Sequence, residues 1–240
     1  MMLPGPSSFP TTRWTLVVAA ANANSEQSRA ALATLCERYW NPLYVYLRRR
    51  GFSPDESQDL TQEFFVRILE GRYLERADRE RGRFRSFLLT SLKFMVSDQK
   101  DHENAAKRGG GMLIPLDFAA GEESYHREPA DDETPDRIFE RRWALTVIDH
   151  VLEGLRSEFE QQGRADYFDR VKVFLLGRDA GPYTTVAAEL NTSEGALKVA
   201  IHRLRKRYRD LFRQEIADTV ADPADVDAEL RYLANVLSKS

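Results

Sequence analysis

Residues 183–209 read YTTVAAELNTSEGALKVAIHRLRKRYR, and this stretch is the most informative part of the chain for its fold. Its pattern predicts a two-turn helix, a tight turn and a long second helix. One face of the second helix is apolar, with Leu197, Ala200, Ile201, Leu204, Tyr208, Leu211 and Phe212. The other face carries Lys198, His202, Arg203, Arg205, Lys206, Arg207 and Arg209. A basic helix of this kind fits the DNA major groove. We therefore predict a helix-turn-helix; the alternative is an ordinary helical hairpin with a solvated cationic face.

Local signals support the turn between these helices. Ser193 is a natural N-cap for the second helix, and Glu194 complements the positive end of its dipole. Asn191 tolerates the left-handed backbone that such turns often need. The turn is thus expected at residues 190–193.

The rest of the chain also has helical periodicity, and no alternating strand pattern stands out. Further helices are predicted at about 12–22, 25–50, 53–70, 84–106, 135–161 and 166–176, and a last one follows Asp222-Pro223. We predict an all-α protein of two helical domains.

Glycine, proline and acidic residues mark the boundary between the predicted domains. Gly109 to Gly111 open a segment that contains Pro115, Pro129 and Pro135 and is rich in Asp and Glu, which is typical of a flexible linker. We predict a disordered N-terminus at 1–11, a first domain at 12–108, a flexible acidic linker at 109–136, a second domain with the helix-turn-helix at 137–216, and a C-terminal extension helix within 217–240.

Composition narrows the function classes. The 240 residues carry a net charge of −3, so DNA binding is expected to be local, through the basic helix, and not a general coating. A single cysteine, Cys36, excludes an internal disulfide and fits a reducing compartment. No apolar run is long enough to span a bilayer. Residues 16–23 imitate a secretory leader but also fit a helix face, so we expect a cytoplasmic protein without membrane contact.

The sequence offers little for catalysis. The four histidines, His102, His126, His150 and His202, are scattered and have no cysteine cluster near them, which disfavours a zinc site. The triple glycine lacks the Lys-Ser/Thr of a phosphate-binding loop, and no serine lies in a nucleophile elbow. We expect no catalytic residue, no metal and no cofactor, and hence no enzyme.

Two clusters in the first domain point to binding. Asp55, Asp59 and Glu63 recur every four residues and form an acidic stripe, which is either a solvated face or a docking surface for a basic partner. Cations and aromatics then alternate in Arg72, Tyr73, Arg76, Arg79, Arg81, Arg83, Phe84, Arg85, Phe87, Lys93 and Phe94. Such interleaving is typical of single-stranded DNA binding, although Phe84 and Phe87 also fit a core.

Three motifs in order, with a linker between the second and third, resemble the extracytoplasmic-function sigma factors of bacterial RNA polymerase. They are DESQDLTQEFFVRIL at 55–69, FRSFLLTSLKFMVSD at 84–98 and TSEGALKVAIHRLRKRYR at 192–209. The resemblance covers about 14–215. Phe94 stands where many members carry Asn, the stretch QKDHENAAKR at 99–108 is less basic than in most members, and the helix after Asp222 lies beyond the minimal family architecture.

The resemblance implies a role for each motif. Docking on core polymerase would use Asp55, Asp59, Leu60, Gln62, Glu63 and Phe64, with Leu60 and Phe64 as packing positions. Contacts to the promoter's minus-ten element would use Arg72, Arg83, Arg85, Phe87, Lys93 and Phe94. Contacts to the minus-thirty-five element would use Thr184, Ser193, Glu194, Lys198, His202, Arg203, Arg205 and Lys206. The implied partners are the polymerase core, promoter DNA in duplex and single-stranded form, and an anti-sigma factor or other regulator.

Three hypotheses follow. The first is a sigma factor that directs polymerase to promoters and promotes strand opening. The second is a stand-alone regulator that binds duplex operators through the C-terminal helices. The third is an interaction protein in which the helix-turn-helix is a packing unit. Ser57 and Thr61 on the docking helix are also candidates for phosphorylation, although ordinary polar helix residues explain them more simply.

Overall fold

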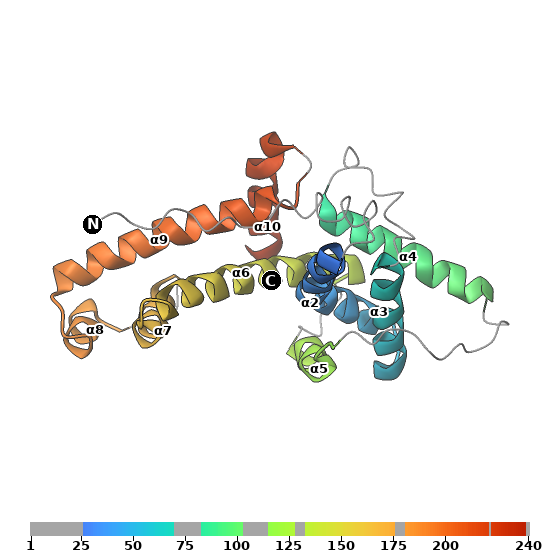
Figure 1. The fold of residues 1–240 in the computed structure, drawn as a ribbon, viewed down its shortest axis with the longest axis horizontal. Helices are drawn as coiled ribbons and strands as arrows, with labels where there is room; N and C mark the ends of the chain where they lie inside the picture. Colours follow the sequence, from blue (N-terminus) through green and yellow to red (C-terminus); the bar gives the residue numbers. More distant parts are fainter. Residues whose placement is uncertain are drawn as a thin grey trace. The chain divides into compact units, whose positions relative to one another are not determined.

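The computed structural model describes residues 26–69, 83–102, 115–127, 133–175, 181–220 and 222–238. These residues form helices, with no strand among them, which confirms the all-α prediction (Figure 1). The α-helices are α2 (Glu26–Arg49), α3 (Pro54–Leu69), α4 (Phe84–His102), α5 (Phe118–Arg127), α6 (Pro135–Glu160), α7 (Ala165–Val171), α8 (Tyr183–Glu189), α9 (Glu194–Ala217) and α10 (Val226–Ser238). The 3₁₀ turns η3 (Lys172–Phe174) and η4 (Pro223–Asp225) follow α7 and precede α10. The helix predicted at 12–22 lies outside the described residues.

The chain divides into two compact units by its internal contacts. Unit 1 comprises residues 1–146 and 217–240, and unit 2 comprises residues 147–216. The C-terminal helix α10 therefore belongs to unit 1, although it is far from the rest of that unit in sequence. The division runs through α6, whose residues contribute to both units.

The core of unit 1 is aromatic. The ring of Tyr39 in α2 stacks on Trp143 of α6 at 4.4 Å between centroids, and Phe84 of α4 lies 6.1 Å from the same indole. All three side chains are fully buried, as is Phe64 of α3. Large aromatic side chains contribute much of the burial energy of a small core, so these contacts hold α2, α4 and α6 together.

Helix α3 begins as its sequence predicts. The backbone N–H of Glu56 donates to Ser53 Oγ at 3.3 Å, while the Ser53 N–H donates to Glu56 Oε2 at 2.8 Å. This reciprocal capping satisfies two donors that a helix start leaves unpaired. Hydrogen bonding of the Glu56 carboxylate to the Ser53 backbone, and secondly to the Ser53 side chain, lowers the pKa of Glu56. The cap thus fixes where α3 begins, and with it the positions of the acidic residues along the helix.

The segment expected to be a flexible linker contains a packed helix. Gly121 of α5 is buried, and a Cβ built on it would lie 2.8 Å from the Trp40 ring of α2. Glu122 accepts hydrogen bonds on Oε1 from Tyr44 Oη at 2.6 Å and from Arg48 Nε at 2.5 Å. The structure thus differs from the prediction at 118–127, because one glycine and one carboxylate fix this acidic stretch to α2.

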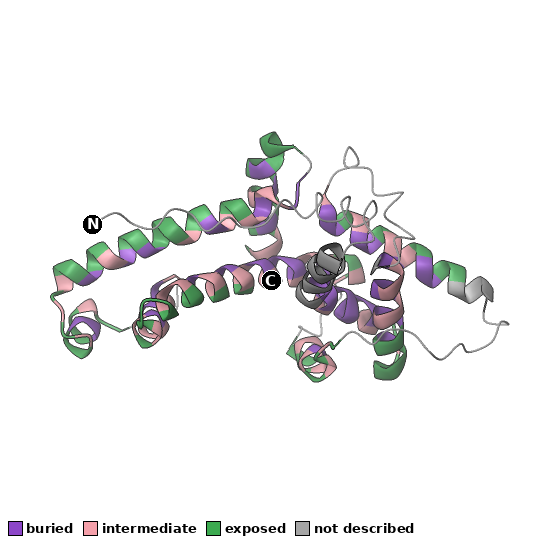
Figure 2. Ribbon diagram, viewed as in Figure 1, coloured by how far each residue is buried: buried purple, intermediate pink, exposed green. Residues whose placement is uncertain are grey.

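Unit 2 has a core of its own, built from α6, α7, η3, α8 and α9. Its buried residues are Val151, Leu155, Phe168, Val171, Phe174, Val186, Ala187, Leu197, Ile201, Leu204 and Leu211. Buried positions recur along one side of α9, and exposed positions occupy the other side (Figure 2). The apolar face predicted for this helix is confirmed.

Candidate nucleic-acid interface

The helix, turn and helix predicted from residues 183–209 are present. Helix α8 ends at Glu189, and Asn191 follows with a φ of 51°, in the left-handed region that the sequence led us to expect. Ser193 Oγ accepts the N–H of Ala196 at 3.2 Å, which confirms Ser193 as the N-cap of α9. The hydrogen bond from Thr192 N–H to Ala187 O, 2.9 Å long, closes the turn against α8.

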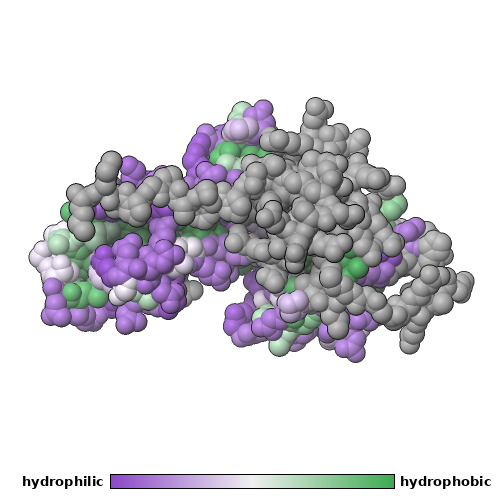
Figure 3. Space-filling model, in the orientation of Figure 1, coloured by the Kyte–Doolittle hydropathy of each residue, from purple (hydrophilic) through white to green (hydrophobic). Residues whose placement is uncertain are grey.

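The predicted DNA-facing side chains lie mostly on the solvent side of this unit. Exposed positions are Thr184, Ser193, Lys198, His202, Arg203, Arg205 and Lys206, whereas Glu194 is half-buried. The described surface of unit 2 is mainly hydrophilic in this view, with small hydrophobic patches (Figure 3). A solvent-facing row of cations on a single helix is what phosphate binding requires.

Some of these side chains already have partners inside the protein. Lys198 Nζ lies 2.6 Å from Glu194 Oε1 and 5.6 Å from the centre of the Tyr183 ring. The hydrogen bond to Glu194 raises the pKa of Lys198. Arg205 donates from Nη2 to the carbonyl of Phe174 at 3.1 Å. A DNA contact by Lys198 or Arg205 would therefore have to replace an internal contact.

Three other polar side chains of α9 are differently placed. No ion pair or hydrogen bond is recorded for the side chains of His202, Arg203 or Lys206 within the described part of the chain. All three are exposed. They are the side chains of this row that can reach a phosphate or a base edge without breaking a described contact.

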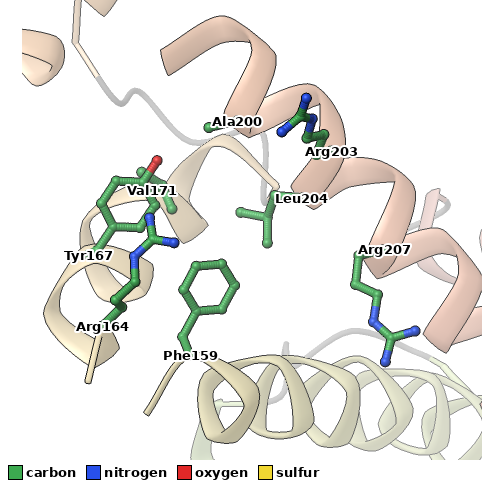
Figure 4. Close-up of a pocket in the computed structure, with 8 residues that line it drawn as sticks. All are labelled: Phe159, Arg164, Tyr167, Val171, Ala200, Arg203, Leu204 and Arg207. Carbon is green, nitrogen blue, oxygen red and sulfur yellow. The ribbon is translucent and has the colours of Figure 1, made fainter. Parts of the chain in front are cut away.

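A hollow of about 360 Å³ lies between α6, α7 and α9 in unit 2 (Figure 4). Phe159 rises from the end of α6 toward Leu204 of α9, and Arg164 lies against Tyr167, its guanidinium carbon 4.4 Å from the ring centre. Arg207 at the rim is bound to Glu158. The lining is largely apolar, as expected for packing between these helices.

The acidic stripe of α3 is placed for contact with a partner. Asp55 and Asp59 are exposed, while Leu60 and Phe64 are buried, as their packing role predicts. Gln62 and Glu63 are half-buried, and Glu63 is paired with Arg67 one turn away. The two aspartates are the most accessible charges of the stripe.

The hydroxyls of this helix are not on its surface. Ser57 and Thr61 are both fully buried, and Thr61 Oγ1 donates to the Ser57 carbonyl at 2.7 Å. The sequence suggested either phosphorylation sites or ordinary polar helix residues, and neither interpretation predicted that Ser57 and Thr61 are buried. In the described conformation a kinase could not reach either hydroxyl.

The proposed minus-ten residues are distributed unevenly. Phe94 on α4 is 51% exposed, the largest exposed fraction among the large hydrophobic residues described. Phe87 is half-buried, and its ring centre lies 6.1 Å from that of Phe84. Lys93 is paired with Asp136 and lies 5.8 Å from the Tyr46 ring. Arg72 lies outside the described residues.

Arg85 is the clearest departure from expectation. Its side chain is 2% exposed and ion-paired with Glu140 of α6 and Glu229 of α10, so it is not available for DNA contact in this arrangement. Burial lowers the pKa of the Arg85 guanidinium, and burial likewise raises the pKa of Glu140 against the opposing effect of Arg85. Arg83 is 40% exposed, and its Nε lies 2.7 Å from Glu229 Oε2.

The sequence analysis missed the two glutamates that hold these arginines. A signal for Glu229 was present, because it occupies the same face of α10 as Val226 and Leu233, both of which are buried. A carboxylate on an apolar helix face needs a cationic partner. Nothing in the sequence around Glu140 distinguishes it from the other charged residues of α6.

Part of the chain is similar to a known protein family. Residues 35–104 match the family model for sigma-70 region 2, which covers most of α2 and all of α3 and α4. The resemblance to extracytoplasmic-function sigma factors is confirmed. The matched range contains the acidic stripe of α3 and the whole motif at 84–98 on α4.

A relative of known class aligns beyond this region. The chain is 24% identical over 187 residues to the ECF RNA polymerase sigma factor SigE of Mycolicibacterium smegmatis, an alignment that covers 77% of this chain. The chain spans about 63% of the length of that relative. No solved structure matches the chain at a significant level.

Among the described residues, no group of three or more His, Cys, Asp or Glu side chains is placed to hold a metal ion. No helix in the described ranges is long and apolar enough to cross a membrane.

Proposed function

We propose that this protein is a sigma factor that binds core RNA polymerase, recognises promoter minus-thirty-five and minus-ten elements and promotes strand opening. The observation that carries the proposal is the sigma-70 region 2 match on α2 to α4, followed in the same chain by a helix-turn-helix with a basic second helix. A stand-alone operator-binding regulator would have no need of the first of these two parts.

Core binding is assigned to the exposed part of the α3 stripe. Asp55 and Asp59 face solvent one turn apart, on a helix whose start is fixed by the Ser53 cap. Exposed carboxylates on a rigid helix attract a basic partner surface and orient the complex. Leu60 and Phe64 support the helix from below and do not touch the partner directly.

Duplex recognition is assigned to α9. Arg203 and Lys206 are exposed and unengaged within the described residues, and His202 lies on the same helix face. An arginine that donates two hydrogen bonds to a guanine discriminates against the wrong base by about 1–3 kcal/mol. Lys198 and Glu194 would have to separate before either contacts a base.

Minus-ten recognition is assigned to α4. Phe94 offers an exposed ring on which an unpaired base can stack, a contact worth about 1–3 kcal/mol per base. Lys93 lies next to it in sequence and is 40% exposed, so it can supply charge to the neighbouring phosphate. Strand opening would draw on this stacking to offset the loss of base pairing.

Run-off transcription with core polymerase over a library of promoter fragments tests the proposal. We expect promoter-specific transcripts with the wild-type chain. We also expect that Asp59→Arg weakens core binding at least tenfold, on the order of 1.4 kcal/mol, because it reverses the charge that faces the partner. Glu153→Arg, an equal charge reversal at an exposed position of α6, is the matched control and should leave core affinity unchanged.

A gel shift with and without core enzyme separates the proposal from the stand-alone regulator. Tight duplex binding by the free chain, unaffected by polymerase and by Asp59→Arg, would reject the sigma-factor role in favour of an operator-binding protein.

A further inference from the structure

The end of the chain lies against the start of α4, where minus-ten contacts are assigned. Glu229 of α10 is completely buried and forms ion pairs with both Arg83 and Arg85. The backbone is joined there as well, since the Phe84 N–H donates to the Thr219 carbonyl at 2.9 Å. Thr219 and α10 therefore contact the N-terminal end of α4 within unit 1.

The ring of Tyr232 completes the contact. It lies one helical turn after Glu229 on α10, with the Arg83 guanidinium carbon 5.1 Å and that of Arg85 4.9 Å from its centre. Guanidinium groups this close to an aromatic face are attracted by its quadrupole. One carboxylate and one ring of α10 thus engage the same pair of arginines.

These two groups are the kind that single-stranded nucleic acid offers to arginine. A phosphate accepts charge-assisted hydrogen bonds from guanidinium as a carboxylate does, and a base supplies a flat ring for stacking. A nucleotide that approached Arg83 and Arg85 would find the ion-pairing contact taken by Glu229 and the stacking contact taken by Tyr232.

We propose that α10 is an internal competitor for nucleic acid, in which Glu229 stands in for a phosphate and Tyr232 for a base at Arg83 and Arg85. The inference rests on the proposed role of α4 in minus-ten recognition and adds its regulation. While α10 is docked, the start of α4 has low affinity for single-stranded DNA. Release of α10 leaves Arg85 paired with Glu140 and removes both the Glu229 carboxylate and the Tyr232 ring from Arg83.

The partial exposure of the contact makes release accessible. The Arg83 side chain is 40% exposed and Tyr232 is 37% exposed, so water and a competing strand can reach this edge of the cluster first. Glu229 is fully buried, so a competing strand can replace it only after α10 has moved away from α4. The apparent affinity for DNA then equals the intrinsic affinity multiplied by the fraction of molecules in which α10 is undocked.

Fluorescence anisotropy with a labelled single-stranded oligonucleotide tests the proposal on the full chain. We expect Glu229→Gln and Tyr232→Ala each to tighten binding about threefold to tenfold, because each raises the undocked fraction. The matched controls are Asp227→Asn, which removes the same charge from the same helix, and Tyr232→Phe, which keeps the ring. Both controls should stay within about twofold of wild type, since both keep the Glu229 carboxylate and the aromatic ring that contact the arginines.

A double variant locates the effect. Adding Arg83→Ala to Glu229→Gln should return the affinity to the wild-type value, because the gain depends on the freed guanidinium. Circular dichroism and thermal melting of each variant report whether unit 1 remains folded. If Glu229→Gln unfolds the chain, Tyr232→Ala decides alone, since its side chain lies at the edge of the cluster.

Unchanged DNA affinity in folded Glu229→Gln and Tyr232→Ala, or equal gains in Asp227→Asn and Tyr232→Phe, would overturn the competitor role and leave α10 as a structural strap. Run-off transcription by the same proteins separates this result from failure of the sigma-factor role. Promoter-specific transcripts with unchanged DNA affinity in the variants reject only the competitor. A gain in DNA affinity without any promoter-specific transcript rejects only the sigma-factor role.

Discussion

Single residues decide the local geometry of the helix-turn-helix. Asn191 has a φ of 51°, which costs an ordinary residue about 1–2 kcal/mol but suits Asn and Gly. The sequence could predict this position because few residue types tolerate it. The sequence could not predict the partner of Lys198, since Glu194 and a DNA phosphate are equally good ligands for an ammonium group.

Replacing Asn191 tests the strain in this turn. We expect Asn191→Val to destabilise unit 2 by about 1–2 kcal/mol, because a β-branched side chain is particularly unfavourable at positive φ. Asn191→Gly should lie within a few tenths of a kcal/mol of wild type, because glycine adopts this conformation freely. Thermal unfolding followed by circular dichroism measures both, and equal melting temperatures for the two variants would contradict the assigned backbone conformation.

At the scale of elements, helix positions followed from the sequence far better than helix contacts did. Capping residues, proline and apolar spacing predicted α3, α4, α6 and α9 within a few residues, because these signals act along the chain. Helix α5 was missed because its surroundings read as acidic and proline-rich. Its stability comes from Trp40, Tyr44 and Arg48 of α2, which are more than 70 positions away.

The close approach of α5 to α2 makes an unusual prediction for glycine. We expect Gly121→Ala to destabilise unit 1 by about 1–3 kcal/mol, although alanine normally favours a helix, because the new methyl group would overlap Trp40 and Tyr44. Gly154→Ala in α6 is the matched control, with nothing within 4 Å of the added Cβ, and should stabilise its helix by up to about 1 kcal/mol. Urea unfolding of both variants provides the comparison, and stabilisation by Gly121→Ala would refute the packing described for α5.

The same pair of helices should respond to acid. Burial raises the pKa of Glu122, but hydrogen bonds from Tyr44 and Arg48 outweigh this effect, so the pKa of Glu122 lies below its ordinary value. A lowered carboxyl pKa stabilises the folded state above the unfolded-state pKa, and this contribution is lost as pH falls through the folded-state value. We expect the stability difference between wild type and Glu122→Gln to be largest near neutral pH and to shrink below about pH 4.5. Urea titrations at a series of pH values would show this, whereas a pH-independent difference would contradict the ionised contact.

At the scale of the whole molecule, the assignment of α10 to unit 1 was beyond sequence reasoning. The pattern of α10 predicts an amphipathic helix, but an apolar face does not specify which surface it covers. The contact depends on the pairing of Glu229 with two arginines more than 140 positions earlier. Long-range charge pairs of this kind leave no periodic trace in a single sequence.

A core substitution in α10 tests this assignment. Trp40 and Trp143 are both buried in unit 1, so their fluorescence reports the unfolding of that unit. We expect Leu233→Ala to lower the stability seen by fluorescence by about 2–5 kcal/mol, because Leu233 is 1% exposed. Leu211→Ala in unit 2 is the matched control and should change the circular dichroism transition with little effect on fluorescence. The division into units would be contradicted if Leu211→Ala shifted the fluorescence midpoint and Leu233→Ala left it unchanged.

The single cysteine of the chain has a practical consequence. Cys36 is completely inaccessible, and it belongs to the helix against which most of unit 1 is assembled. A maleimide added to the native protein can react with Cys36 only in molecules that have transiently opened. The rate of Cys36 labelling therefore measures how often such openings occur. A dye attached to a second cysteine introduced on the exterior would report from one known place, with the wild-type chain serving as its own unlabelled reference.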